Sequence, residues 1–330
     1  DLHLSIRRQR QMCIRDSRKA YLRDRICAGY LARQTHPGRP ALTKTTDSTY
    51  GQPSQPIKTI RDSAWLAKRP WLRRPAVTAF RLFLKLVTRN RGLKTRIGSA
   101  GTFNLDYAFA SATYDDWGSG HNSGFQKTLD LCRGKSTVFD IGAHIGLYAL
   151  PISRVMEARG TIYAFEPAKQ NLLLLNKHVR YNHVRNIVVV PYLVGDQSTD
   201  AAAFYESGAA SGTNSILPNI DVATYRQVSR PQISIDDFCA QNRVAPEVIK
   251  IDVEGAEMRV IDGALEIMER VRPVIVLSVH PGRIKALGDS VNDLMRMIVD
   301  AGYTASDTGG RPAISGSRLH DLVLEPIFSA

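Results

Sequence analysis

The sequence of 330 residues contains few cysteines and no long apolar run, and each absence excludes a class of protein. The cysteines form no Cys-x-x-Cys pair, which argues against a disulfide framework and a zinc site; they are Cys13, Cys27, Cys132 and Cys239. Because no stretch of about 18 consecutive apolar residues occurs, we expect no transmembrane helix. The N-terminus also lacks a basic stretch followed by an apolar core and a small-residue cleavage site, so we expect a cytoplasmic protein.

Patterns typical of two bound groups are missing as well. The eight histidines show no metal-ligand spacing, so we expect no metal site and metal-independent chemistry. The dinucleotide pattern Gly-x-Gly-x-x-Gly is also absent, because His144 takes the place of its second glycine in the most similar turn. This absence counts against a nicotinamide-dependent oxidoreductase.

The net charge of +13 is concentrated at one end of the chain. Residues 1–100 contain 23 Lys and Arg against 5 Asp and Glu, a balance of +18. Residues 101–330 contain 21 against 26, a balance of −5. A slightly acidic folded part is a poor match to a surface that follows phosphates, so we expect no nucleic-acid partner.

The chain divides into three parts. Residues 1–60 are rich in Arg, Gln, Ser, Thr and Pro, which predicts a disordered or non-native extension. Residues 61–100 are predicted to form a basic helical segment, with the best helix from about Pro75 to Thr88. That helix either packs on the domain or makes peripheral contact with an anionic membrane surface. Residues 101–330 are predicted to form the catalytic domain.

Beyond Gly134, apolar runs of strand length alternate with helical patterns. The runs show no consistent alternation, as is typical of strands buried on both faces, and they are Ser136–Ile141, Thr161–Phe165, Ile187–Val194, Val248–Val253 and Val274–Val279. The helical patterns are Gln170–Asn182, Gly255–Arg270 and Val291–Ala301. This order predicts an α/β fold with a doubly wound, mostly parallel sheet. The Ser/Gly/Asn-rich stretch 201–232 predicts an inserted hairpin or loop.

Polar residues lie at or near the ends of all five predicted strands, namely Asp140, Glu166, Asp196, Asp252 and His280. Ligands of open α/β sheets bind outside the carboxyl ends of the strands, so these residues predict a binding site. A single polar residue at a strand end commonly caps a helix or forms a turn. That alternative stays open for Glu166, Asp196 and His280.

Two short runs are the most informative. The run Asp140–Gly146 has the pattern Asp-x-Gly-x-x-x-Gly, in which glycines let the backbone approach a ligand closely. The run Ile249–Glu257 places Lys250, Asp252 and Glu254 at alternate positions. Burying such charges without partners would cost on the order of several kcal/mol each. They are therefore expected either to form ion pairs that fasten strand to helix or to line a water-filled cleft.

The segments Phe139–Gly146, Ala164–Pro167, Ser234–Phe238 and Ile249–Glu257 together resemble the FkbM-type family of S-adenosylmethionine-dependent methyltransferases. The resemblance covers about two-thirds of the chain. It implies a class I methyltransferase (Rossmann-like) fold, with a seven-stranded sheet whose last, antiparallel strand lies near Val323–Pro326. It also implies S-adenosylmethionine as the cofactor and a hydroxyl oxygen as the methyl acceptor, often on a sugar or a polyketide.

The resemblance and the strand ends together predict the site residues. The predicted cofactor-binding residues are Asp140, Gly142 and Gly146 at the methionine part, Glu166 at the ribose, Asp196 at the adenine, and also His144 and Asp252. Where the family often has Asn, this chain has His144. Asp252 and His280 are the candidate general bases, and the unperturbed pKa of histidine suits that role better. The predicted substrate-binding residues are Lys250, Glu254, Glu257 and Asn214.

These observations predict an O-methyltransferase that acts on a saccharide or a secondary metabolite, with a small-molecule or glycan acceptor as its partner. The segment Tyr114–Asn122, which is rich in aromatic and hydrogen-bonding side chains, is either an acceptor-binding segment or a polar loop. A nicotinamide-dependent oxidoreductase and a non-catalytic cofactor-binding relative remain the alternatives.

Overall fold

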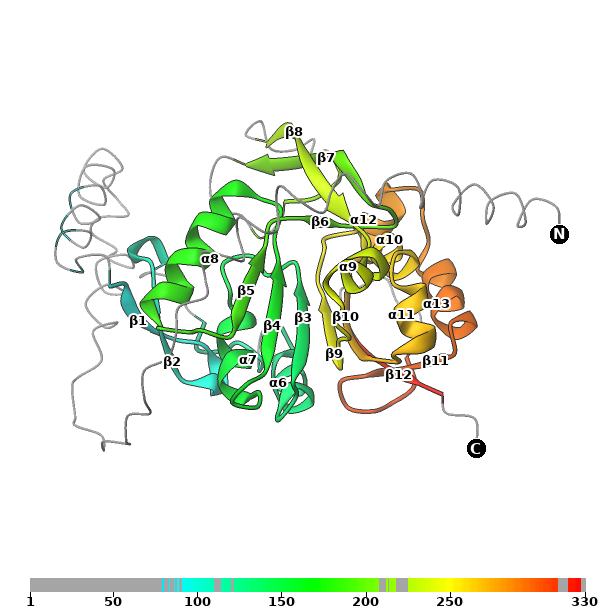
Figure 1. Cartoon of the computed structure of the whole chain (residues 1–330), viewed down its shortest axis with the longest axis horizontal. Coiled ribbons are helices and arrows are strands. Elements are labelled where there is room, and N and C mark those ends of the chain that lie inside the picture. Colours follow the sequence, from blue (N-terminus) through cyan, green and yellow to red (C-terminus); the bar gives the residue numbers. More distant parts are fainter. Residues whose placement is uncertain are drawn as a thin grey trace, which may run out of the picture. The chain divides into compact units, whose positions relative to one another are not determined.

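A computed structural model of the chain describes residues 91–109, 114–119, 122–207, 212, 214–217, 225–313 and 320–327 (Figure 1). Ala79, Phe83, Leu86 and Thr88 are also described, and all four are helical. The predictions for residues 1–60 lie outside the described residues, as do most of the predicted helix Pro75–Thr88 and its membrane contact. Among the described residues, no helix combines the length and apolar character that are needed to span a bilayer.

The described core of the molecule is a seven-stranded sheet. Its spatial order is β11 (Tyr303–Asp307), β12 (His320–Pro326), β10 (Val274–Val279), β9 (Val248–Ile251), β3 (Thr137–Ile141), β4 (Thr161–Phe165) and β5 (Ile187–Val190). Strand β12 runs antiparallel to both of its neighbours, and the pairs among β10, β9, β3, β4 and β5 are parallel. This arrangement confirms the predicted doubly wound α/β sheet with an antiparallel last strand.

Helices cover both faces of this sheet (Figure 1). One face carries α6 (Phe125–Cys132), α7 (Ala149–Val155) and α8 (Lys169–Tyr181), and the other carries α9 (Ile235–Asn242), α10 (Glu257–Asp262), α11 (Leu265–Arg270) and α13 (Val291–Asp300). The strands are apolar on both sides for this reason. In β3, Val138 belongs to the core under α7, whereas Phe139 and Ile141 belong to the core under α9 and α10.

Serine side chains fix the starts of two helices. Ser234 accepts a hydrogen bond from the backbone N–H of Asp237 at the start of α9, at 3.1 Å. Ser290 does the same for Asp293 at the start of α13, at 3.0 Å. Each cap of this kind stabilises its helix by about 1 kcal/mol, because it satisfies a free backbone donor.

The predicted strand Ile187–Val194 is wrong, because the chain forms two strands there. Strand β5 ends at Val190, and Pro191 follows without the N–H that would continue the ladder. Strand β6 (Leu193–Val194) then joins a separate sheet with β8 (Tyr225–Ile233) and β7 (Thr199–Ser207). The antiparallel pair β7–β8 is the inserted hairpin that the sequence predicted as one alternative.

Two other element boundaries differ from the prediction. Strand β9 ends at Ile251, so Asp252 follows the strand instead of lying in it. The predicted helix Gly255–Arg270 is divided into α10 and α11 at Gly263. A Cβ at Gly263 would lie 2.1 Å from the carbonyl oxygen of Gly195, so the helix is interrupted where another backbone passes against it.

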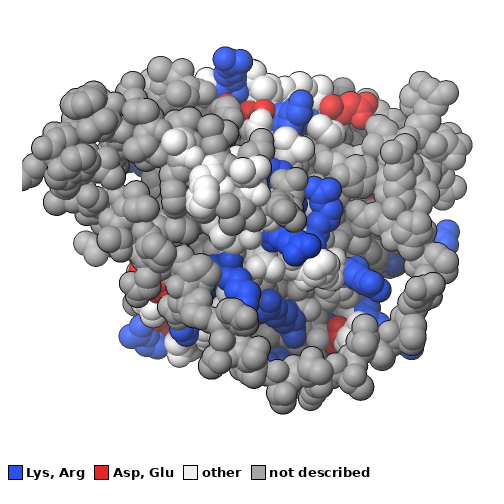
Figure 2. Space-filling model, turned by 90° about the vertical axis from the view of Figure 1, so that its left-hand side faces the viewer, with Lys and Arg blue, Asp and Glu red and all other residues white. Residues whose placement is uncertain are grey.

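The segment predicted as basic and helical ends in a hairpin. Strand β1 (Leu93–Arg96) pairs antiparallel with β2 (Thr102–Leu105), and Ile97 between them is fully buried. Asn104 exchanges hydrogen bonds of 2.8 Å with Asn182 at the end of α8. The folded domain therefore begins before residue 101. Figure 2 shows Lys and Arg side chains prominent on the described part of the face that carries this hairpin and α8.

Candidate functional site

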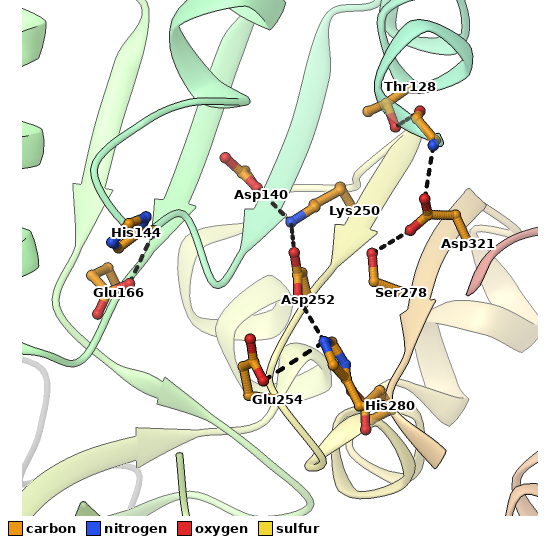
Figure 3. Close-up of polar contacts among 12 residues, drawn as sticks. Thr128, Asp140, His144, Glu166, Lys250, Asp252, Glu254, Ser278, His280 and Asp321 are labelled. Carbon is orange, nitrogen blue, oxygen red and sulfur yellow. Dashed lines mark hydrogen bonds and ion pairs between the residues drawn. The ribbon is translucent and has the colours of Figure 1, made fainter. Parts of the chain in front are cut away.

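The carboxyl ends of four adjacent strands meet at one edge of the sheet (Figure 3). In spatial order these strands are β10, β9, β3 and β4, and the residues that directly follow them are His280, Asp252, Gly142 and Glu166. The sheet grows in one direction through β3 and β4 and in the other through β9 and β10. The crevice outside such a reversal is where open α/β sheets bind ligands.

A buried line of charges crosses this edge. The register of the parallel strands pairs Asp140 with Lys250, so the two side chains lie on the same face of the sheet. The ammonium nitrogen of Lys250 lies 4.0 Å from Oδ1 of Asp140 and donates a hydrogen bond of 3.1 Å to Oδ2 of Asp252. It also lies 4.4 Å from the centre of the Tyr148 ring. Lys250 thus holds together two strand ends, and its side chain is buried.

The pKa values follow from this burial and pairing. Burial raises the pKa of Asp140 to about 6, although the charge of Lys250 acts in the opposite direction. Burial also lowers the pKa of Lys250, but the charges of Asp252 and Asp140 outweigh it and raise that pKa overall. The pKa of Asp252 is lowered, because Lys250 and His280 outweigh the effect of its burial. Lys250 and Asp252 therefore form a charged pair near pH 7, and 30% of the Asp252 side chain is exposed.

The glycine turn Asp140–Gly146 lies directly against the backbone of Asp252. Gly142 has a φ of +83°, and the backbone N–H groups of Gly142 and Ala143 donate to the carbonyl of Phe165 at 3.0 and 2.9 Å. A Cβ at position 142 would lie 1.9 Å from the carbonyl oxygen of Asp252. Gly146 has a φ of +93° and lies against Leu175 of α8. Both glycines are thus required by conformation and by close approach.

The variant Gly142→Ala is expected to be less stable than the matched variant Gly134→Ala. Gly134 has a similar φ of +70° but open space around the added methyl group. The left-handed backbone costs both variants about 1–2 kcal/mol. The contact with Asp252 adds about 1–3 kcal/mol in Gly142→Ala alone. Urea denaturation measures the difference, and equal stability of the two variants would contradict this packing.

Glu166 and His144 form the other side of the site. The Glu166 carboxylate accepts hydrogen bonds from the backbone N–H of His144 at 2.9 Å, that of Ala168 at 2.8 Å and the Asn171 side chain at 3.2 Å. Burial raises its pKa to about 7. None of these donors is a backbone N–H of α8, which begins at Lys169, so the helix-capping alternative is not confirmed. The three bonds leave room for about one more donor at the carboxylate.

The ring of His144 lies beside the site and is uncharged near pH 7. Its φ is +51°, and burial lowers its pKa to about 4, so the ring is neutral near pH 7. Its Nε2 atom is buried and has no hydrogen-bond partner among the residues that the structure describes. A buried polar atom of this kind is suited to accept a hydrogen bond from a bound group or to donate one to it.

His280 lies among three carboxylates. Its Nδ1 makes a hydrogen bond of 2.6 Å with Oε1 of Glu257, and its Nε2 lies 3.7 Å from both Oδ1 of Asp252 and Oε2 of Glu254. The guanidinium of Arg283 lies 2.9 Å from the same oxygen of Glu254. Burial alone would lower the pKa of His280, but the hydrogen bond with Glu257 and the three negative charges outweigh it and raise the pKa.

This cluster also changes the prediction for metals. One ligand atom each from Asp252, Glu254 and His280 lies within 4.8 Å of the other two, which is a geometry that could hold a cation. The spacing of the histidines along the chain gave no sign of it, because two of these ligands are carboxylates from the loop after β9. In Figure 3 the three side chains lie opposite His144 and Glu166.

Residues of the segment between β7 and β8 contact the site. The Ser215 hydroxyl donates a hydrogen bond of 2.8 Å to the carbonyl of Glu254. A Cβ at Gly212 would lie 3.7 Å from the His144 ring. Asn214 lies between these two contacts in the chain, so the structure brings the predicted substrate segment next to the site.

The aromatic segment before β3 packs near the site on the α6 and α7 face. Trp117 makes edge-on contacts with Phe125 and Tyr148, with ring centres 6.5 and 6.4 Å apart. Tyr148 in turn covers the ammonium of Lys250. Sequence reasoning did not identify Tyr148 or Arg283, because their contacts arise from strand register and helix packing between distant parts of the chain.

Three predicted site residues lie elsewhere than the sequence suggested. Asp196 is exposed and follows β6 of the second sheet, and its backbone lies against Gly263 between α10 and α11. Lys250 is buried beneath Asp252. The side chain of Glu257 is fully buried behind His280. Lys250 and Glu257 were predicted to bind substrate, but burial keeps both from direct contact with it.

The chain matches known proteins in sequence. The family described as "Methyltransferase FkbM domain" matches residues 140–305, which is half of the chain. The hexuronic acid methyltransferase AglP of Haloferax volcanii is 27% identical over 157 residues, which cover 47% of this chain and 60% of that protein. The chain therefore spans less than two-thirds of that relative's length.

Solved structures are similar at lower identity. The methyltransferase FkbM from Methylobacillus flagellatus is 20% identical with a TM-score of 0.39, over 58% of this chain and 44% of that one. An O-methyltransferase from Bacillus cereus, in a complex with SAH, is 11% identical with a TM-score of 0.39, over 64% of this chain and 82% of that one.

Proposed function

This chain belongs to the FkbM methyltransferase domain family, and on that basis we propose that it transfers a methyl group from S-adenosylmethionine to a hydroxyl oxygen of a saccharide or a secondary metabolite. The observation that carries the proposal is the convergence of four strand ends. There the glycine turn and the imidazole of His280 lie on either side of Asp252.

The residues at this edge fit the proposed cofactor. His144 offers a neutral, buried nitrogen that has no hydrogen-bond partner among the described residues, and the positive φ of Gly142 and Gly146 holds the turn in its conformation. Asp252 offers an ionised carboxylate, which would suit the positive charge of the sulfonium. Glu166 has capacity for about one more hydrogen bond, which suits one ribose hydroxyl better than two. We do not propose Asp196 for the adenine, because its side chain is exposed and it follows β6 of the second sheet.

The chain's own residues would align the acceptor and receive its proton. S-adenosylmethionine, when bound, supplies a methyl group that its sulfonium already activates. Alignment of two reactants can be worth about 7–11 kcal/mol. His280 is the better of the two candidate bases, because its pKa is raised whereas that of Asp252 is lowered. Asp252 would hold the imidazolium that forms, through the Nε2···Oδ1 approach of 3.7 Å.

The relative AglP supports a saccharide as the acceptor class. Its name specifies a hexuronic acid, which offers both hydroxyl and carboxylate oxygens. A hydroxyl must lose a proton to accept the methyl group, whereas a carboxylate has none to lose. The histidine at the site therefore favours a hydroxyl acceptor. The segment around Asn214 and Ser215 is the proposed contact with that acceptor.

Titration calorimetry with S-adenosylmethionine, S-adenosylhomocysteine and NAD tests the proposed cofactor. We expect both S-adenosyl compounds to bind and NAD not to bind. The variant His144→Phe is expected to weaken S-adenosylmethionine binding by about 10-fold, because the loss of a buried hydrogen bond costs about 1–2 kcal/mol. Binding of NAD alone would overturn the proposal in favour of an oxidoreductase. Turnover of a hydroxylated saccharide with labelled cofactor then tests the reaction, and binding without any turnover would favour a non-catalytic relative.

A further inference from the structure

The feature that the proposed function leaves unexplained is the fully buried carboxylate of Glu257. It is the first residue of α10, and none of its side chain is exposed. Its Oε1 atom accepts a hydrogen bond of 3.1 Å from the backbone N–H of Gly255 and lies 2.6 Å from Nδ1 of His280. Within the described part of the chain, its Oε2 atom has no hydrogen-bond partner. A buried carboxylate is costly, so a structure that keeps one has to compensate for it.

Glu257 sits on one side of the imidazole and the open site on the other. The nitrogen that faces Glu257 is Nδ1, and the nitrogen that faces Asp252 and Glu254 is Nε2. A carboxylate can only accept hydrogen bonds, so Nδ1 carries the hydrogen in this pair. In the neutral ring, Nε2 then holds the free electron pair. The side of the ring that can accept a proton is therefore the side that faces the site.

Three carboxylates face His280, and the guanidinium of Arg283 lies against one of them. Asp252 and Glu254 come from the loop after β9, Glu257 from α10, and Arg283 from α12 (Pro281–Ala286). Arg283 is in contact with Glu254 at 2.9 Å and offsets its charge. Asp252 is likewise paired with Lys250 at 3.1 Å. Among these three carboxylates, Glu257 is the one whose side chain has no ion-pair partner in the described residues other than His280.

We propose that Glu257 is the positioning residue of a Glu257–His280 pair, and that it directs Nε2 of His280 at the acceptor hydroxyl. This inference rests on the proposed function. As the acceptor oxygen forms its bond to the methyl carbon, the carbon–sulfur bond breaks and its electron pair stays on sulfur. The hydroxyl proton passes to Nε2 of His280, and Glu257 stabilises the resulting imidazolium through Nδ1–H. Glu257 itself takes no part in the bonds that form and break, and it touches neither substrate.

Nuclear magnetic resonance of the protein with ¹⁵N-labelled histidine tests the pair without any turnover. The shifts of Nδ1 and Nε2 of His280, assigned with the variant His280→Gln, report which nitrogen carries the hydrogen. In the full chain we expect the hydrogen on Nδ1. In Glu257→Gln we expect a mixture of the two forms and a lower pKa of His280, because the charge and the specific acceptor are lost. The control is Glu269→Gln on the exposed face of α11, which should leave the His280 shifts unchanged.

Kinetics provide the second readout. In Glu257→Gln we expect kcat to fall by at least about 10-fold, which is part of the roughly 10²–10⁴-fold that a positioned base typically contributes, while KM for S-adenosylmethionine stays the same. The acid limb of the pH profile of kcat/KM should move to lower pH. Glu257→Asp, which keeps the charge, should restore part of kcat and move the acid limb back. Circular dichroism and S-adenosylmethionine binding confirm that each variant is folded.

Three results would overturn the pairing. One is an unchanged His280 tautomer and pKa in folded Glu257→Gln. Another is a loss in KM without a loss in kcat. The third is activity that requires Mn²⁺ and is abolished by EDTA, with Mn²⁺ broadening the His280 signals, since His280 would then be a metal ligand with Asp252 and Glu254. If no acceptor is methylated, the proposed function fails while the magnetic resonance result still decides the Glu257–His280 pair.

Discussion

Replacement of His280 by Gln is expected to lower kcat for a hydroxyl acceptor by about 10²–10⁴-fold. The dissociation constant for S-adenosylmethionine should remain close to that of the unmodified chain. The reason is geometric: Nε2 of His280 lies 3.7 Å from Asp252 and Glu254, on the face of the ring that opens on the site. At 1.36 kcal/mol for each tenfold change, this loss corresponds to about 3–5 kcal/mol of transition-state stabilisation. Single-turnover kinetics with labelled cofactor measure it.

The pH dependence of the rate provides a second test of His280→Gln. The pKa of His280 is raised above its usual value of 6.5, mainly because its hydrogen bond with Glu257 and three nearby carboxylates outweigh burial. The ring can accept a proton only when it is neutral. The rate should therefore rise with pH, with a midpoint above 6.5. This acid limb should disappear in His280→Gln, because the titrating group is gone.

Two further variants test whether His280 itself is the base. His183→Gln, at an exposed position after α8, should leave kcat unchanged and controls for the change of residue type. Asp252→Asn should reduce kcat less than His280→Gln does, because the lowered pKa of Asp252 makes it the weaker base. The assignment of the base to His280 fails if the two site variants show the reverse order, or if His280→Gln loses cofactor affinity and retains kcat.

The fold could be predicted from local patterns because most strands are buried on both faces. Thr161–Phe165 and Val274–Val279 are apolar runs bounded by polar or turn-forming residues, and both form strands with the predicted bounds. The prediction was wrong where a local signal competes with a packing requirement. The apolar character of Ile187–Val194 continues across Pro191, but the hydrogen-bond ladder does not. Gly263 interrupts a continuous helical pattern because Gly195 packs against it.

The site could be predicted in its outline but not in its contacts. The strand-end rule identified Asp140, Asp252 and His280, since it depends only on where strands stop. It did not distinguish residues that face the site from those that lie behind them. Glu257 was predicted to touch substrate, yet it lies beneath His280, because the chain turns after β9 and α10 begins against β10. Such an arrangement depends on the angle between elements, which no sequence pattern specifies.

Replacement of Lys250 by Met is expected to lower the free energy of unfolding by about 3–5 kcal/mol, because it leaves a buried carboxylate without its cation. The side chain of Asp140 is completely buried, and Lys250, also buried, lies 4.0 Å from it and 3.1 Å from Asp252. The matched control is Lys135→Met, which removes an exposed ion pair with Glu247 at 3.5 Å. Exposed pairs contribute about 0–1 kcal/mol, so the control should be nearly as stable as the unmodified chain.

The pH dependence of this loss identifies its cause. A buried carboxyl whose folded pKa is raised contributes most to stability while it is protonated, and this contribution is lost as the pH rises through the folded pKa. The pKa of Asp140 is already raised to about 6 by burial, with Lys250 acting against that rise. Without Lys250 the pKa of Asp140 should rise further. The loss in free energy of unfolding caused by Lys250→Met should therefore be largest above pH 7 and shrink towards pH 5.

The double variant with Asp140→Asn should recover part of the stability. Urea denaturation at both pH values measures these differences. A cost that is independent of pH would instead attribute the loss to the altered packing around Tyr148, which covers the Lys250 ammonium at 4.4 Å.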